Sequence, residues 1–356
     1  MDEVAVGPPG AISTSGDVDD RRWSRILGAY REARHTRTLF EIASTALPFL
    51  LFWGGALALA AFGHWWGVVL ALPAAAFLVR LFMIQHDCGH GALFRHRSAN
   101  DWIGRAIGVL TLTPYDYWRR THAVHHASAG NLDQRGMGDV VTLTVDEYAA
   151  MSKMQRLGYR TYRNPAILLV AGSVITFIFK HRLPMGLMRK GFRPWLSTMG
   201  TNLAIAVLFG LLIWAVGVGP FLLVQLPVTI AAGAIGIWLF FVQHQFEETY
   251  WANEDEWTFQ AGALHGSSHY DLPAVLRWFT ANIGIHHVHH LASRIPFYRL
   301  GQVLKDFPEL RDRGRLTLRM SFRSARLALW DERSRRLISF RDAAALGRVT
   351  PAVSAA

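Results

Sequence analysis

The chain has 356 residues, of which 51% are hydrophobic and only 18% are charged, and its formal net charge is +11. So small a polar surface argues against a water-soluble protein, and the positive charge fits either a membrane protein with a cationic face or a nucleic-acid binder. No zinc-finger, helix-turn-helix or RNA-binding motif accompanies the charge, so we expect a membrane partner and no nucleic acid. The single cysteine, Cys88, excludes an intrachain disulfide.

Residues 1–22 are polar and contain Gly, Pro, Ser and several Asp residues. They lack the basic start and short apolar core of a secretory signal. We therefore expect a disordered N-terminal tail in the cytoplasm.

Four apolar runs follow, each close to the ~20 residues that a helix needs to cross a bilayer. They cover residues 46–63, 67–84, 201–218 and 221–242. The links within each pair, 64–66 and 219–220, hold no Lys or Arg, whereas the segments outside the pairs are rich in both. The positive-inside rule predicts two transmembrane hairpins with both termini in the cytoplasm. Arg80 lies near the cytoplasmic end of the second run, and we expect its side chain to snorkel to the interface.

Two shorter apolar segments and one basic segment complete the predicted elements. Residues 166–179 are too few for a span and predict an interfacial or re-entrant helix, and residues 103–113 predict a helix lying on the membrane. The segment 311–356 alternates Arg with apolar residues. It predicts a basic amphipathic segment after a membrane domain at 23–310, either solvated at the membrane surface or serving as a docking face for an acidic electron carrier.

Three short histidine clusters, spaced HxxxH, HxxHH and HxxHH, carry the chemistry. They consist of His86, His90, His122, His125, His126, His286, His289 and His290. At these spacings the members of a cluster share one face of a helix. One zinc ion needs about four ligands, so eight histidines point to two metal ions, and the predicted topology brings them all to one membrane–cytosol boundary. Imidazole ligands make iron the best redox candidate and zinc the best non-redox one.

With their flanks, the clusters resemble the three histidine boxes of the membrane fatty acid desaturase family. The matching strings are HDCGHGALF, HAVHHASAGNLDQRGMGDVVTLT, QHQFEETYW and NIGIHHVHHLASRIPFYRL, and they look most like bacterial acyl-lipid Δ5- and Δ12-type enzymes. The resemblance implies an all-α integral membrane protein of the bacterial inner membrane, with four spans, interfacial helices and a cytoplasmic helical cap that holds a dimetal site. It also implies O₂-dependent desaturation of a lipid-linked acyl chain at a non-haem diiron centre. The electrons would come from an external ferredoxin-, flavodoxin- or cytochrome-like carrier.

The family's ligand roles carry over to the eight clustered histidines, and His244 is our choice for a ninth over His265 and His269. Residues near the clusters that could fix the imidazole tautomers are Asp87, Asn131, Asp133, Asp139, Glu247 and Asn282. Candidate walls of a substrate tunnel are Trp102, Trp118 and Phe279. Candidate contacts for a lipid headgroup are Arg119, Arg120 and Arg294.

Two alternative functions remain open at this point. The first is a diiron hydroxylase or related oxygenase of a lipid or carotenoid, which would add oxygen rather than remove hydrogen. The second is a zinc-dependent membrane lipid hydrolase, which would need neither iron nor O₂ and would usually include carboxylate ligands.

Overall fold

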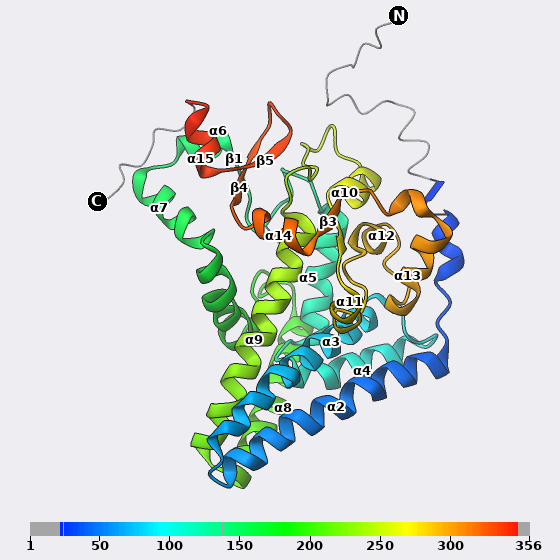
Figure 1. Ribbon diagram of the computed structural model, residues 1–356, viewed down its shortest axis with the longest axis vertical. Helices are drawn as coiled ribbons and strands as arrows, with labels where there is room; N and C mark the ends of the chain where they lie inside the picture. Colours follow the sequence, from blue (N-terminus) through cyan, green and yellow to red (C-terminus); the bar gives the residue numbers. More distant parts are fainter. Residues whose placement is uncertain (1–21, 24, 137, 348–356) are drawn as a thin grey trace, which may run out of the picture.

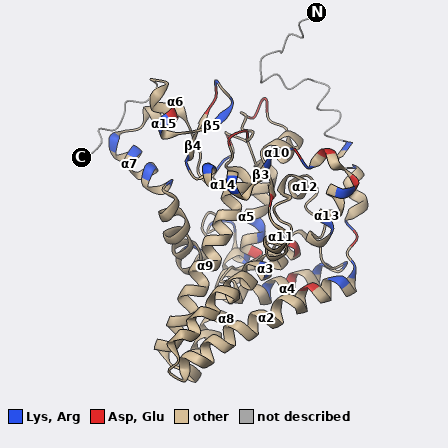
Figure 2. Ribbon diagram, in the orientation of Figure 1, with Lys and Arg blue, Asp and Glu red and all other residues tan. Residues whose placement is uncertain are grey.

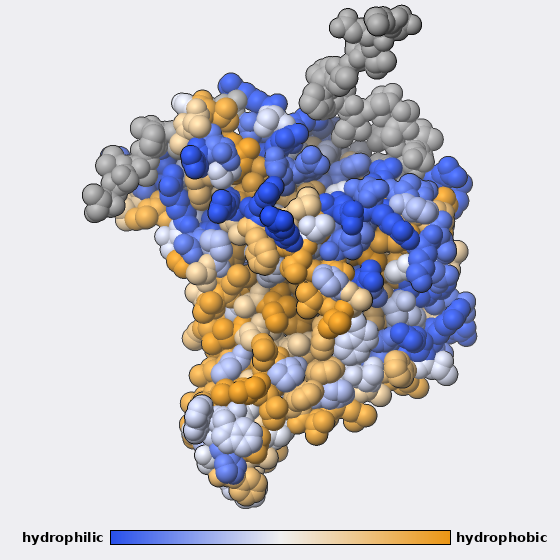
Figure 3. Space-filling model, in the orientation of Figure 1, coloured by the Kyte–Doolittle hydropathy of each residue, from blue (hydrophilic) through white to orange (hydrophobic). Residues whose placement is uncertain are grey.

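A computed structural model describes residues 22–23, 25–136 and 138–347. The tail predicted at 1–22 lies outside these residues, apart from Arg22. The described chain is mainly helical, and its long apolar helices gather at one end of the molecule, below a cap of shorter helices and two small sheets (Figure 1). The space-filling view shows the same division, with hydrophobic residues over the helical end and hydrophilic residues over the cap (Figure 3).

Four helices among the described residues are long and apolar enough to cross a membrane, which confirms the predicted fold class. They are α2 (His35–Ala61), α3 (Ala71–His90, extended backwards by the 3₁₀ turn Trp65–Leu70), α8 (Phe192–Val216) and α9 (Val218–His244). Figure 2 shows Lys and Arg concentrated in the cap and at the cap-facing ends of these helices. The chain is thus an integral membrane protein.

The helix α3 is the centre of the bundle, since it packs against α2, α9 and α4 (Arg97–Leu110). Small residues such as Ala74 and Ala75 are fully buried along it and allow this close approach. The helix α8 is the opposite case, because Leu203 and Trp214 are 67% and 86% exposed. In a bilayer, that face of α8 contacts lipid.

Arg80 does not snorkel, so that prediction was wrong. Its side chain is buried in the bundle, where Nη2 lies 2.5 Å from Oε2 of Glu41 and Nε donates to Oγ1 of Thr45 at 3.1 Å. Its guanidinium also donates to the carbonyl of Trp278 and stacks over that ring at 4.0 Å. The sequence prediction failed because α2 begins at His35 rather than at residue 46, which brings Glu41 into the bundle.

A bent helix pair stands where the short re-entrant helix was predicted. The helix α7 (Lys153–Tyr162) and the segment Ile167–Arg182 meet at 71°, as a broken span or a re-entrant loop. Pro165 lies between the two arms. Proline disfavours a helical conformation in the residue before it, which explains why the helix breaks there. The second arm consists mainly of π-helical turns, at Ile167–Ala171 and Val174–Phe179, followed by a 3₁₀ turn at Lys180–Arg182. Such turns concentrate at functional sites.

The cap is built from short helices that are connected through loops. They are 3₁₀ turns at Leu27–Tyr30 and Pro308–Leu310, α5 (Tyr115–Ser128), α6 (Val145–Ala150), α10 (Phe259–His265), α11 (Ala274–Phe279), α12 (His286–Leu291), α13 (Phe297–Asp306), α14 (Leu318–Ser324) and α15 (Phe340–Ala345).

Two small sheets join the C-terminal segment to the rest of the cap. The cap therefore contains strands, which the prediction of a helical cap did not include. In the first, β4 (Leu327–Asp331) pairs in parallel with β1 (Leu143–Thr144) and antiparallel with β5 (Arg336–Ser339). In the second, β2 (His269–Asp271) pairs in parallel with β3 (Arg315–Thr317). Residues 311–347 thus differ from the separate amphipathic segment that we expected, because Leu329 clusters with Val145 of α6 and Trp330 clusters with Trp251.

Candidate metal centre

Four helices bring the predicted histidines to one place. His86 and His90 lie on successive turns at the end of α3, which stops at Gly91, a residue with φ of +69°. His122, His125 and His126 share the inner side of α5, His244 is the last residue of α9, and the third box forms the short helix α12. Each helix thus ends or lies at the boundary between the spans and the cap.

The imidazoles form two groups, and in each group the candidate ligand nitrogens all lie within 4.8 Å of one another. The first group contains His86, His90, His122, His126 and His289. The second contains His125, His244, His286 and His290. Each group could hold one metal ion, and together they contain the eight box histidines and His244.

Within each group, the Nε2 atoms face one another at nearly constant separation. In the first, Nε2 of His122 lies 3.2 Å from that of His90 and 3.0 Å from that of His126, which lies 3.2 Å from that of His289. In the second, the chain His125–His244–His286–His290 has successive Nε2 separations of 3.1, 3.0 and 3.1 Å. Nitrogens so arranged point at two common centres.

Three of these imidazoles are oriented by acceptors on their outer side. Nδ1 of His86 donates to Asp87 at 3.1 Å, Nδ1 of His125 donates to Asp139 at 2.5 Å, and Nδ1 of His244 donates to the carbonyl of Gly266 at 3.0 Å. A proton held at Nδ1 leaves a lone pair on Nε2, which is the form that binds a metal. Asp87 also accepts from the backbone N–H of Phe297 at 2.7 Å, which joins the first box to α13.

Four other imidazoles of the two groups have no such acceptor at Nδ1 in the part of the chain that the structure describes. Nδ1 is buried without a hydrogen-bond partner among the described residues in His126, His286, His289 and His290. Burial holds the pKa of each of these four side chains, and of His122, well below the ordinary value for histidine, so all five are neutral. A neutral imidazole can offer an Nε2 lone pair to a cation at the shared centre, so both groups could hold a metal ion.

The remaining predicted outer partners do not touch the imidazoles. Asn131 bonds to Glu254 at 2.7 Å, and Asp133 accepts from the backbone N–H of Glu254 at 2.8 Å. Glu247 is exposed and lies 3.5 Å from Arg336. Asn282 has φ of +55° and donates to the carbonyl of Phe297 at 3.1 Å, so it shapes the turn before the third box.

Three further histidines lie beside the centre without joining either group. Nε2 of His287 donates to the carbonyl of Leu310 at 2.9 Å, and burial lowers the pKa of His287 to about 3. Nδ1 of His269 donates to the carbonyl of Arg311 at 2.6 Å, and its ring lies 5.7 Å from that of His287. His265 ends α10 and is half-buried. These contacts tie the third box to the C-terminal segment.

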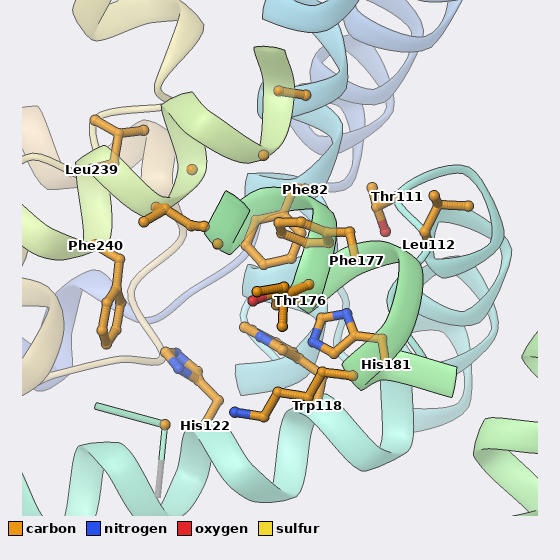
Figure 4. A pocket seen from close by; sticks show the side chains of 18 of the residues that line it. Phe82, Thr111, Leu112, Trp118, His122, Thr176, Phe177, His181, Leu239 and Phe240 are labelled. Carbon is orange, nitrogen blue, oxygen red and sulfur yellow. The ribbon is translucent and has the colours of Figure 1, made fainter. Parts of the chain in front are cut away.

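A cavity of about 820 Å³ opens beside the two groups, within the ~300–1,000 Å³ typical of small-molecule sites. His86, His122 and His286 line one part of it, and most of the remaining wall is apolar. The wall comes from α3, α5, α9 and the arm Ile167–Arg182. Figure 4 shows Phe82, Phe177 and Trp118 gathered around this space, with His122 beside them.

The cavity includes only one of the three predicted tunnel residues. Trp118 lines it, whereas Trp102 is 69% exposed on α4 beside Arg105, and Phe279 packs against Phe77 at 5.2 Å. The wall residues that the sequence analysis missed include four on the arm Ile167–Arg182, which are Thr176, Phe177, Lys180 and His181. Thr176 and Phe177 belong to the apolar run that is too short to span, and Lys180 and His181 follow it directly.

None of the three predicted headgroup arginines lines the cavity. Arg119 lies 3.0 Å from Asp101 and 3.6 Å from Asp116. Arg120 follows it on α5 and is half-buried, and Arg294 is exposed after the third box. Lys180 is the one Lys or Arg among the described residues of the cavity wall.

Comparison with known proteins shows which family this chain belongs to. The family model described as Fatty acid desaturase matches residues 63–322, which include all three boxes. The chain belongs to the fatty acid desaturase family. It is therefore an oxidoreductase that acts on fatty acids.

Several relatives of this desaturase are similar over much of their length. A fatty acid desaturase of Bacillus subtilis is 38% identical over 323 residues, which are 90% of this chain and 91% of the relative. An sn-1 acyl-lipid omega-3 desaturase (ferredoxin) of Synechocystis sp. is 30% identical, over 62% of this chain and 61% of the relative. An sn-1 oleoyl-lipid 12-desaturase of the same organism is 27% identical, over 63% of both chains.

The Asp139–His125 hydrogen bond gives a first prediction. Replacing Asp139 by asparagine removes the charge that holds the proton on Nδ1, and we expect metal affinity to fall by ~10–100-fold. Competition with a chelator measures this affinity. Asp133→Asn is the matched control, since Asp133 is exposed and contacts no histidine of either group. Equal metal affinity in the two variants would contradict the role given to Asp139.

Proposed function

We propose that this desaturase introduces a cis double bond into a lipid-linked fatty acyl chain, with O₂ as co-substrate and electrons from a ferredoxin-like carrier. The nine grouped histidines would hold two iron ions. The relatives support the choice of substrate, because two of them are named acyl-lipid or oleoyl-lipid desaturases, and one name includes ferredoxin.

The observation that carries this proposal is the number of imidazoles gathered in each group. Nine histidines form one group of five and one of four. Five imidazoles are more than a tetrahedral zinc site uses, which favours iron over zinc in the first group.

When bound, two irons would supply the activation of O₂ that removes one hydrogen from each of two adjacent methylenes. The protein would position the metal ligands and the acyl chain and keep water away from the reacting carbons. Asp87 and Asp139 keep the Nε2 lone pairs of His86 and His125 turned inward. The cavity wall excludes water, and its shape decides which methylenes lie beside His86, His122 and His286, because a methylene offers no hydrogen-bonding group.

The cavity follows α9 from Gln243 to Thr229, which is ~21 Å at ~1.5 Å per helical residue. An extended chain advances ~1.2 Å per bond, as a polypeptide does, so this length suits an acyl chain of about 17 bonds.

The charge pattern supports an orientation of the protein in the membrane, since Lys and Arg are concentrated in the cap (Figure 2). We therefore propose that the cap, the metal centre and both termini lie in the cytoplasm, in a bacterial inner membrane.

Gly236 offers a direct test of the cavity's role. It lines the cavity midway between Thr229 and Gln243 on α9, and a Cβ added there meets open space. Gly236→Phe should block the far part of the cavity and lower conversion of long acyl chains relative to short ones by about tenfold or more. Fatty acid profiling of cells that express the variant measures this ratio. Gly210→Phe on α8, where an added Cβ also meets open space, is the control and should keep the wild-type ratio.

Expression in a bacterial host, followed by mass spectrometry of the lipids and localisation of the double bond, tests the proposed reaction. We expect acyl chains that lack two hydrogens, found in intact phospholipids and only in aerated cultures. Acyl chains that gain one oxygen atom would show a hydroxylase instead. Product formed only on acyl thioesters would contradict the lipid-linked substrate.

A further inference from the structure

The nine grouped imidazoles differ in their access to the surface. Seven are buried, while His90 and His122, both in the first group, are partly exposed. His122 lines the substrate cavity, which accounts for its exposure. His90 lines neither that cavity nor the small pocket behind His125 and His244. Among the described residues, His90 is thus the grouped histidine that is partly exposed without lining either of these two spaces.

The surface beside His90 is basic and held in place. Arg97 donates to the carbonyl of Gly89 at 3.2 Å, and Cγ of Arg119 would lie 3.8 Å from a Cβ added at Gly89. One carboxylate anchors both arginines, since Asp101 lies 3.0 Å from each. Asp101 is only 17% exposed and Arg97 is 46% exposed, so the guanidinium group of Arg97 reaches solvent beyond its counter-ion. Arg95 is 67% exposed and pairs with Glu32 at 3.0 Å, which is itself 71% exposed.

An uncharged area borders these arginines on α5. Ala123, Val124 and Ala127 are exposed and follow Arg119 and Arg120 at helical spacing, so they share the outer side of α5. Val124 is 41% exposed. A small apolar area with a cationic rim, next to the partly exposed residue His90, has the layout of a protein–protein interface.

We propose that this surface, formed by Arg95, Arg97, Arg119, Arg120 and the α5 residues Ala123, Val124 and Ala127, docks a small acidic one-electron carrier protein. The inference rests on the proposed function, which requires an external reductant. Each double bond converts one –CH₂–CH₂– unit, one O₂, two electrons and two protons into –CH=CH– and two waters. Two reduced carriers must therefore dock in turn, and each gives up one electron to the metal centre beside His90.

The surface on the other side of the centre suits an acidic carrier less well. The loop that follows His244 carries five exposed carboxylates, at Glu247, Glu248, Glu254, Asp255 and Glu256. Only two of these five carboxylates form an ion pair with an arginine among the described residues, Glu256 with Arg335 at 2.6 Å and Glu247 with Arg336 at 3.5 Å. The four grouped histidines behind this loop are all buried. An acidic protein would be repelled there and would find no exposed ligand.

The test compares two electron sources for the purified protein in nanodiscs, an acidic [2Fe–2S] ferredoxin and dithionite. For Arg97→Gln and for Arg120→Gln, we expect the KM for ferredoxin to rise about fivefold at low ionic strength, the upper range for one exposed ion pair. The Kd of oxidised ferredoxin, measured without substrate or turnover, should rise by the same factor. The loss should be confined to the ferredoxin-driven reaction, because dithionite needs no docking surface.

Arg323→Gln and Arg326→Gln are the controls, since both arginines are exposed in the C-terminal segment. Each of these substitutions removes the same charge as Arg97→Gln. They should leave the Kd and KM for ferredoxin unchanged. A rise in the controls but not in Arg97→Gln would move the docking site to the C-terminal segment and overturn the proposal. An equal loss with both reductants, dependent on anionic lipid in the nanodisc, would assign these arginines to the membrane surface. Absence of product with either reductant would instead defeat the proposed function, while the Kd still reports docking.

Discussion

Replacing His125 by alanine should abolish product formation while the protein still inserts into the membrane. His125 is 1% exposed, its Nε2 lies 3.1 Å from that of His244, and its Nδ1 donates to Asp139. Loss of an outer partner of a ligand already costs ~10–100-fold, so loss of the imidazole itself should cost more. Iron analysis and fatty acid profiling of the same preparation measure the effect, with iron expected to fall below two per chain.

His287 provides the matched control inside the third box. Its side chain is buried like those of its neighbours, but it bonds to the carbonyl of Leu310 and joins neither group. His287→Ala should keep two metal ions per chain and lose only the stability of one buried hydrogen bond, ~1–3 kcal/mol. Unchanged product formation in His125→Ala, or equal metal loss in the two variants, would refute the assignment of ligands.

The buried pair of Arg80 and Glu41 should respond asymmetrically to substitution. Glu41→Gln leaves the charge of Arg80 without a counter-ion inside the bundle, and we expect a loss of ~3–5 kcal/mol in the free energy of unfolding. Arg80→Met should cost less, because Glu41 keeps its second partner, Arg37, at 2.6 Å. The double variant should be more stable than Glu41→Gln alone. Unfolding in detergent micelles, followed by circular dichroism, measures all three.

Glu32→Gln is the control for this comparison, since Glu32 is 71% exposed and its ion pair with Arg95 lies at the surface. It should change stability by less than ~1 kcal/mol. If Glu41→Gln were no more destabilising than Glu32→Gln, the buried pair would not stabilise the bundle.

The features that the sequence predicted best are those with a local pattern. Apolar runs of near-bilayer length predicted the four spans, and helical spacing predicted that each histidine cluster would share a face. His244 was chosen because it ends the fourth span, and the structure brings it within 3.0 Å of His286, although its role as a ligand stays a prediction. Asp87 and Asp139 lie near the boxes in sequence and touch the imidazoles, as expected of residues that fix a tautomer.

The features that the sequence analysis missed depend on contacts between distant segments. Glu41 lies before the first apolar run, so nothing local indicated that it would meet Arg80. Trp102 and Phe279 are close to the boxes in sequence, but the helices that carry them turn their side chains away from the cavity. The strand pairs β1–β4 and β2–β3 join residues far apart in the chain, and such short strands have no periodicity to detect.

Under the proposed function, nine histidines hold two iron ions, five histidines at one site and four at the other. X-ray absorption at the iron edge, combined with elemental analysis of the purified protein, tests it most directly. We expect two irons per chain, with a first shell dominated by nitrogen at ~2.1 Å and a mean coordination number above four. One metal ion per chain, or zinc in tetrahedral coordination, would contradict it.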